Sequence, residues 1–143
     1  MKSIRHILSG KPIDKLFTIS RHATVYEALT LMMEQNVSAV LITDGAKLEG
    51  IFTERDYARK IALKGKTSKE VIISEVMSTE LLTITPQFSI EHCMQIMTDK
   101  HIRHLPVLEN NQLIGIISIG DLVKFVIADQ KHTITELESY IHG

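Results

Sequence analysis

The sequence has no tryptophan, a single cysteine and only three prolines, and aromatic residues make up 5% of its 143 residues. One cysteine excludes an internal disulfide. No apolar run approaches the roughly 20 residues that a membrane-spanning helix needs, so we expect no membrane partner. Residues 1–7 carry charge where a secretory signal would be apolar. We therefore expect a reducing, cytoplasmic compartment.

An excess of positive charge is also missing. Sixteen Lys and Arg residues balance seventeen Asp and Glu residues, which leaves a formal net charge of -1 at pH 7. This balance excludes the wide basic face that binding to nucleic acid or to a membrane surface needs, so any anion site must be local. The 44% of apolar residues is enough for one compact unit or for two halves that share a core.

What the sequence does contain is an internal repeat, with an ungapped offset of 65 residues from Gly50 to Gly115. The offset places residues 16–19 on residues 81–84. It also pairs a glycine, a hydroxyl residue and an aspartate of the two halves: Gly50 with Gly115, Thr53 with Ser118, and Asp56 with Asp121. Matched residues of three chemical kinds in one register indicate a duplicated unit.

Each half predicts a strand, a helix, two strands and a second helix. The first helix begins at a capping box formed by Thr24 and Glu27 and ends near Asn36, and its counterpart begins after Ser89. The apolar segments predicted as strands are residues 17–19, 39–42 and 48–52 in the first half and residues 82–84, 105–108 and 113–117 in the second. The second helices follow Thr53 and Ser118.

The fold class that follows is α/β (α+β). Two βαββα repeats in a pseudo-twofold arrangement should form two small mixed sheets, each three-stranded and flanked by helices. We expect an N-terminal helix in residues 1–10, the first repeat in residues 11–75, the second in residues 76–128, and a helical extension in residues 129–143.

A seven-residue motif occurs once in each half, at residues 50–56 and 115–121: glycine, two apolar residues, Thr or Ser, two variable residues and Asp. Together with residues 102–107, Ile-Arg-His-Leu-Pro-Val, these motifs make the chain resemble a tandem pair of cystathionine-β-synthase (CBS) domains, a Bateman module, of the small stand-alone type. The resemblance covers residues 12–126.

The resemblance implies a regulatory, ligand-sensing module. It implies an adenine nucleotide, AMP, ADP, ATP or NAD, bound as a regulatory ligand in one or both clefts between the repeats. It further implies that the module signals to a separate effector protein. Two alternatives stay open: a structural or protein-interaction module that binds no nucleotide, and a sensor of S-adenosylmethionine.

The hydroxyl and the aspartate of each motif can act on a ligand. Thr53 and Ser118 stand where a strand becomes a helix, and the amino end of a helix attracts anions. A carboxylate three residues later, Asp56 or Asp121, can accept two hydrogen bonds from a ribose diol. The alternative is that each pair only caps its helix. The resemblance assigns the aspartates to ribose and the hydroxyls to phosphate or ribose.

Arg103 and His104 form an adjacent basic pair that suits phosphate, and the matching positions Ser38 and Ala39 carry no charge. Arg55, on the helix after the first motif, is a further phosphate candidate. The resemblance places the other candidates in the cleft wall or against the base: Phe17, Val37, Ser38, Ala39, Ile51, Leu82, Ile102, Pro106, Ile116 and Gly120.

Catalytic and metal sites are not expected. No nucleophile is paired with a base, and no phosphate-binding loop with a lysine is present. His101 and His104 have a spacing seen in some metal pairs, but no third ligand is spaced to complete the site. Cys93 falls at an apolar helical position and is expected to be a buried structural thiol.

Both ends of the chain carry apolar residues at helical spacing. They are Ile4, Ile7 and Leu8 near the start, and Val123, Val126, Ile127, Ile134, Leu137 and Ile141 near the end. Such helices need an apolar partner, which can be the chain's own domain or a second copy of the chain. We expect a homodimer.

Overall fold

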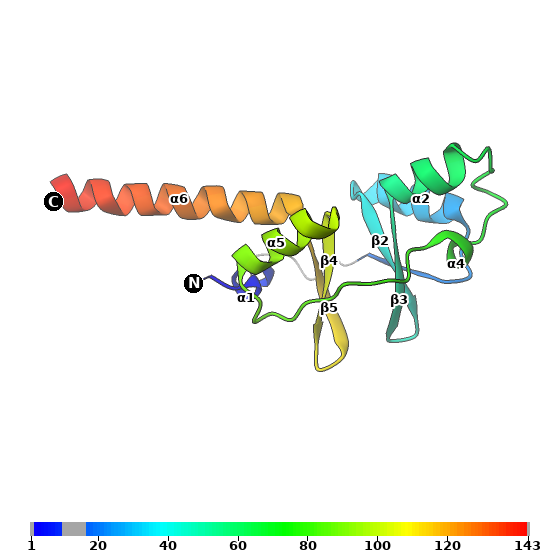
Figure 1. The fold of residues 1–143 in the computed structure, drawn as a ribbon, viewed down its shortest axis with the longest axis horizontal. Helices are drawn as coiled ribbons and strands as arrows, with labels where there is room; N and C mark the ends of the chain where they lie inside the picture. The colour runs from blue at the N-terminus through cyan, green and yellow to red at the C-terminus, as the bar shows by residue number, and fades with distance from the viewer. Residues whose placement is uncertain (1, 10–16, 143) are drawn as a thin grey trace.

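The computed structural model describes residues 2–9 and 17–142. Figure 1 shows two lobes side by side, each built on a small sheet, and a long helix that runs away from the second lobe. The elements are α1 (Ile4–Leu8), β1 (Thr18–Ser20), α2 (Val25–Gln35), β2 (Ala39–Asp44), β3 (Lys47–Thr53), α3 (Glu54–Tyr57), a π-helical turn (Ala58–Ala62), α4 (Ile73–Val76), α5 (Ile90–Lys100), β4 (His104–Glu109), β5 (Gln112–Ser118) and α6 (Ile119–His142). The predicted fold class, mixed α/β with two small sheets flanked by helices, is confirmed.

The first lobe has the predicted three-stranded sheet, in the order β1-β2-β3. β1 is parallel to β2, and β2 is antiparallel to β3. α2 begins where Thr24 Oγ1 accepts a hydrogen bond from Glu27 N at 3.1 Å, and it ends at Asn36, which has a left-handed backbone with φ of 54°. Helix and sheet enclose a core that includes Val25, Met32 and Phe52.

The second sheet has two strands, so the prediction of a third strand at residues 82–84 is wrong. Only Ile84 pairs with β4, through a single parallel bridge to Val107. The reason lies in Pro106, which occupies the position of Leu41 in the first repeat. Leu41 N donates a hydrogen bond to Phe17 O at 3.1 Å, whereas proline has no N–H to give to the corresponding carbonyl of Leu82.

The helices after the two motifs also differ from each other. The helix predicted after Thr53 is regular only over α3 and continues as the π-helical turn to Ala62. Its counterpart after Ser118 is α6, a single helix of 24 residues. Among the described helices, none is long and apolar enough to cross a membrane.

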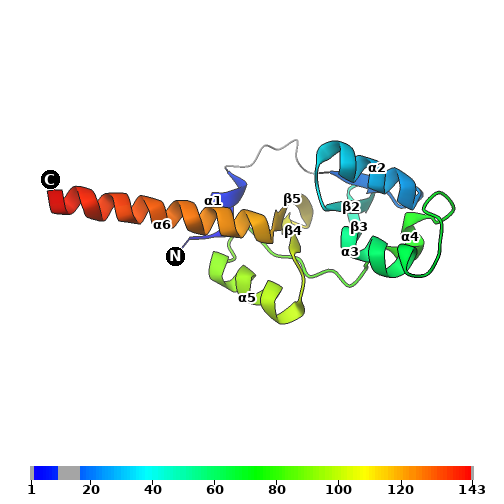
Figure 2. The same cartoon turned by 90° about the horizontal axis from the view of Figure 1, so that it is seen from above.

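The short helices α1 and α4 are exchanged between the lobes. α1 precedes the first repeat but packs into the second lobe, where Ile4 and Ile7 are buried and Ile4 N donates to Phe88 O at 2.9 Å. α4 precedes the second repeat but packs into the first lobe, where Ile73 is buried and its N–H donates to Ala23 O at 2.7 Å. Figure 2 shows α4 beside α2 and α1 beside α6.

The motif glycines make room for this exchange. A Cβ atom on Gly50 would lie 2.7 Å from Sδ of Met77, the residue after α4. A Cβ atom on Gly115 would lie 2.8 Å from Cδ2 of Leu8, the last residue of α1. At Gly50 a Cβ atom would also lie 3.1 Å from the backbone oxygen of Ser78, so a larger residue would push away the chain after α4, whereas at Gly115 only the end of the Leu8 side chain would have to move.

Cys93 lies in the core of the second lobe with a side chain that is 0% exposed, as expected from the sequence. Burial raises the pKa of this thiol from 9.0 to about 11. At neutral pH this lowers the thiolate fraction about 100-fold. We expect negligible labelling by iodoacetamide in native buffer, more as the pH rises towards 11, and complete labelling in urea, as measured by mass spectrometry. Rapid labelling at pH 7 without denaturant would contradict this.

Candidate functional site

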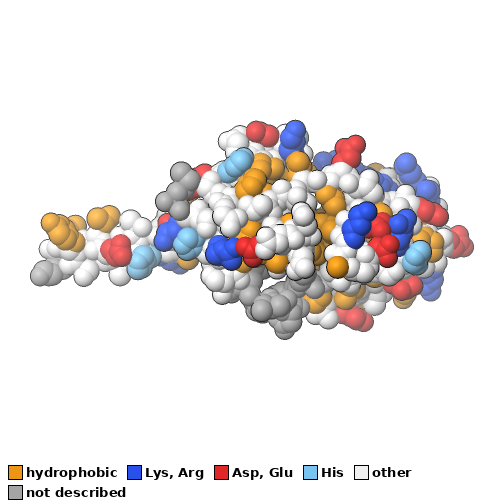
Figure 3. Space-filling model, turned by 90° about the horizontal axis from the view of Figure 1, so that it is seen from below, with side chains coloured by type: hydrophobic (Ala, Val, Ile, Leu, Met, Phe, Trp, Pro, Cys, Tyr) orange, Lys and Arg blue, Asp and Glu red, His pale blue; other side chains and the backbone are white. Residues whose placement is uncertain are grey.

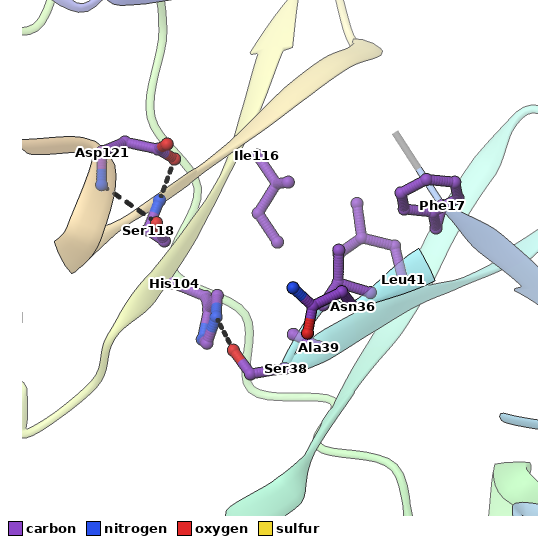
Figure 4. Close-up of a pocket in the computed structure, with 10 residues that line it drawn as sticks. Phe17, Asn36, Ser38, Ala39, Leu41, His104, Ile116, Ser118 and Asp121 are labelled. Atoms are coloured by element: carbon purple, nitrogen blue, oxygen red, sulfur yellow. Dashed lines mark hydrogen bonds between the residues drawn. The ribbon is translucent and has the colours of Figure 1, made fainter. Parts of the chain in front are cut away.

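A pocket of about 240 Å³ lies between the two lobes. Figure 4 shows side chains from both lobes converging on it. The first lobe contributes Phe17, Asn36, Val37, Ser38, Ala39 and Leu41, and the second contributes His104, Ile116, Ser118 and Asp121. The site therefore depends on the packing of one repeat against the other.

A small core between the lobes supports the pocket. Ala39, Leu41 and Ile51 are buried in it, and Leu113 and Ile116 of β5 pack against them. Leu41 and Ile116 also line the pocket, so its floor is apolar. Asn36 reaches the edge of the pocket because its left-handed backbone ends α2 and turns the chain towards β2.

Ser118 and Asp121 line the pocket at the amino end of α6. Ser118 N donates to Asp121 Oδ2 at 2.8 Å, and Asp121 N donates to Ser118 Oγ at 3.1 Å. These reciprocal bonds form the capping arrangement expected from the sequence. They hold a carboxylate at the pocket wall in a fixed orientation, where it can accept hydrogen bonds from hydroxyl groups of a ligand.

His104 and Ser38 meet across the pocket from opposite lobes. His104 is the first residue of β4, and its Nε2 lies 3.0 Å from Ser38 Oγ in a shared hydrogen bond. Figure 4 shows this bond joining the two lobes beside Asn36. An imidazole, a hydroxyl and an amide together can both donate and accept hydrogen bonds.

The aspartate of the first motif has different surroundings. Asp56 Oδ2 accepts hydrogen bonds from Thr53 N at 3.0 Å and Thr53 Oγ1 at 3.1 Å. Asp56 Oδ1 accepts from Ser78 Oγ at 3.2 Å and lies 3.4 Å from Lys60 Nζ. Both carboxylate oxygens of Asp56 thus have protein partners, and Asp56 does not line the pocket.

The two arginine candidates also lie outside the pocket lining. Arg55 Nη1 donates to His101 O at 2.9 Å, so this side chain crosses between the lobes to the carboxyl end of α5. Arg103 is exposed, and its carbonyl accepts a hydrogen bond from Ile119 N at 2.9 Å. Arg103 lies in a bend directly before β4, whereas His104 is the first residue of that strand.

The structure therefore divides the predicted site residues into two groups. Eight line the pocket: Phe17, Val37, Ser38, Ala39, His104, Ile116, Ser118 and Asp121. Nine do not: Ile51, Thr53, Arg55, Asp56, Leu82, Ile102, Arg103, Pro106 and Gly120. Seven of these nine stand one repeat away from a lining residue, at the pseudo-equivalent position. The exceptions are Arg55 and Gly120.

Two lining residues, Asn36 and Leu41, were not predicted. The repeat offset pairs Leu41 with Pro106, which was a candidate, so applying the offset in both directions would have identified Leu41. Asn36 could have been found from its position at the predicted helix end.

Among residues 2–9 and 17–142, no group of three or more His, Cys, Asp or Glu side chains could hold a metal ion.

Comparison with known proteins follows the same division into repeats. The family model of the CBS domain matches residues 4–63 and 73–128. The CBS domain-containing protein CBSX3, mitochondrial, of Arabidopsis thaliana is 40% identical over 125 residues, which are 84% of this chain and 61% of that protein. The chain thus spans less than two thirds of that relative's length.

Solved structures agree with this match. A protein with CBS domains from Burkholderia ambifaria MC40-6, described as a candidate signal-transduction protein, has 44% identity and a TM-score of 0.86 over 90% of this chain and 96% of that one. The CBS domain pair of protein MJ0100, in complex with 5'-methylthioadenosine and S-adenosyl-L-methionine, has 24% identity and a TM-score of 0.77 over 90% of this chain and 98% of that one. With both repeats matched, the chain belongs to the CBS-domain family and contains a CBS pair.

Proposed function

We propose that this chain is a regulatory module that binds an adenine nucleotide in the pocket between its lobes and signals the bound state to a separate protein. The observation that carries the proposal is the position of Asp121, a carboxylate held at the pocket wall by Ser118. A carboxylate so placed can accept two hydrogen bonds from a ribose diol. As a class, CBS pairs are regulatory and non-catalytic, which supports a binding role.

The remaining lining residues suit the other parts of such a ligand. Phe17, Leu41 and Ile116 provide apolar contact for a purine ring. His104, together with the amino end of α6, provides a place for a phosphate group. Ligand binding would join groups of the two lobes, so occupancy can change how the lobes pack. A change in lobe packing is a signal that a partner protein can detect.

S-adenosylmethionine is a second candidate, because the carboxylate of Asp121 lines the pocket. A carboxylate attracts a sulfonium cation and repels a polyphosphate. A CBS pair of the same fold, that of protein MJ0100, is in complex with this compound. AMP, NAD and S-adenosylmethionine share the adenosine group and are separated by what is attached to it.

The proposal is tested by identifying the ligand directly. The purified protein is denatured, and the released compounds are identified by absorbance near 260 nm and by mass spectrometry. Calorimetric titration with adenosine, AMP, ATP, NAD and S-adenosylmethionine then gives the affinities. Failure of all five to bind the ligand-free protein would favour the structural, nucleotide-free module.

His104→Ala is expected to weaken AMP binding about 10-fold, on the order of the 1.4 kcal/mol that one hydrogen bond to a charged group contributes, while adenosine affinity changes little. Ser38→Ala is the control, because it removes the bond to His104 but keeps the imidazole. Arg103→Ala should leave both affinities unchanged, since Arg103 does not line the pocket. Calorimetric titration measures the AMP and adenosine affinities of each variant. Equal losses for AMP and adenosine in His104→Ala would assign His104 to pocket shape.

A further inference from the structure

The projecting part of α6 exposes a row of large apolar side chains. Val123 is 44% exposed and Ile127 48%, and farther along Ile134 is 54%, Leu137 58% and Ile141 74% exposed. Figure 3 shows apolar side chains along the free end of this helix. Within the described residues, the chain's own lobes leave this face largely uncovered. A solitary helix with such a face lacks the apolar packing that gives helices most of their stability in water.

The spacing of these residues is that of a coiled coil. They follow one another at intervals of four, seven, three and four residues, and Gln130 fills the seven-residue interval. In heptad notation the a positions are Ile127, Ile134 and Ile141, and the d positions are Val123, Gln130 and Leu137. β-branched residues at a favour two parallel strands, and of the three d positions that of Leu137 holds the leucine usual in such coils. We call these six residues the α6 seam.

We propose that the α6 seam binds the same seam of a second copy of this chain, in a parallel, in-register two-stranded coiled coil. Gln130 indicates both the partner and the orientation. In a parallel pair of identical chains, each d residue faces its own counterpart, so the two Gln130 amides can bond to each other. In the antiparallel register that aligns all six layers, Gln130 would instead face Ile134 and leave a buried amide unsatisfied.

The rest of α6 is suited to this arrangement. Leu122, near its start, is 0% exposed, so the lobe fixes the first turns and the coil does not need to nucleate a helix. Away from the seam, His132 Nε2 and Glu136 Oε1 form a 2.9 Å ion pair when the histidine is protonated. Polar groups thus occupy the face that would remain in water. The inference is independent of the ligand in the pocket.

Light scattering on the full chain at tens of micromolar tests the seam. The wild-type protein should have a mass of about 32 kDa, twice the 16.1 kDa of one chain. Ile134→Glu should reduce the mass to that of one chain, whereas Thr135→Glu, outside the seam, should leave it at the dimer value. Ile134 is exposed in the single chain, so the lobes of the variant should unfold at the wild-type temperature. A wild-type monomer, or an Ile134→Glu dimer, would overturn the proposal.

Disulfide trapping tests the orientation. Leu137→Cys, which keeps Gln130, should form a covalent dimer under mild oxidation, because parallel in-register packing brings the two thiols face to face. His132→Cys, on the opposite face, should remain uncrosslinked, and the native Cys93 is buried. Non-reducing gel electrophoresis reads out both. Crosslinking of the two variants to the same extent would overturn the parallel seam.

Discussion

Asp121→Ala is expected to weaken binding of adenosine and its nucleotides roughly 10- to 150-fold. The reason is that Asp121 lines the pocket and a hydrogen bond to a charged group contributes about 1.5–3 kcal/mol. The free energy of unfolding should fall much less, by about 1 kcal/mol, the cost of a lost helix cap. Calorimetric titration and urea denaturation measure the two effects separately.

Asp56→Ala is the matched control, because it removes the same cap from the equivalent helix. Asp56 does not line the pocket, and its oxygens bind Thr53, Ser78 and Lys60. Its loss should therefore reduce stability and leave adenosine affinity unchanged. The opposite pattern would assign the ligand to the pseudo-equivalent position around Asp56. Unchanged affinity in both variants would mean that each aspartate only caps its helix.

Ile4→Ala should destabilise the protein by about 2–5 kcal/mol, although Ile4 lies near the end of the chain. Ile4 is 0% exposed in the core of the second lobe, and removal of a buried isoleucine side chain leaves a cavity. Because α1 packs into the second lobe, we expect that lobe to lose protection against hydrogen exchange. Hydrogen exchange measured by mass spectrometry should accelerate in α5, β4 and β5 more than in β1, β2 and β3.

Ile73→Ala provides the reciprocal measurement. Ile73 of α4 is also 0% exposed, but it belongs to the core of the first lobe. Its loss should have a similar cost and should accelerate exchange mainly in α2 and β1 to β3. If Ile4→Ala loosened the first lobe, or Ile73→Ala the second, the packing of α1 into the second lobe and of α4 into the first would be contradicted.

The repeat and its main elements could be predicted because local signals and the offset agree. Thr24 with Glu27 gives a capping box, and Asn36 allows the left-handed backbone that ends a helix. In the second repeat Ser89 caps α5 by accepting a hydrogen bond from His92 N, and His101, with φ of 56°, ends it. When capping residues, apolar periodicity and an internal repeat point to the same boundary, the expected element forms.

Other features depend on neighbours that are distant in sequence. The missing third strand of the second sheet follows from one absent N–H at Pro106, and it can be recognised only once the repeats are superimposed. The exchange of α1 could not be predicted, because nothing near Ile4 indicates whether its apolar face meets residues of the first or of the second half. Local periodicity shows that a helix needs a partner but does not identify it.

Which repeat supplies the pocket lining could not be predicted from the sequence, for a related reason. Because the chain is a repeat, most candidate site residues have a counterpart 65 positions away, one near Asp56 and the other near Asp121. The sequence alone does not show which of the two lines the pocket. Asp56 is bound by Lys60 and Ser78. In the second repeat the position of Lys60 is occupied by Phe125, so the surroundings of the two aspartates differ.

The exchange of α1 also sets an order of events during synthesis. The amide of Ile4 bonds to the carbonyl of Phe88, a partner that is made 84 residues later. At translation rates of roughly 5–20 residues per second, the apolar side of α1 stays uncovered for about 4–17 s. The core of the first lobe is completed with a shorter delay, because α4 follows that lobe directly in the chain. The second lobe should therefore be the later one to fold, because its core is complete only when α1 and the residues around Phe88 are both present.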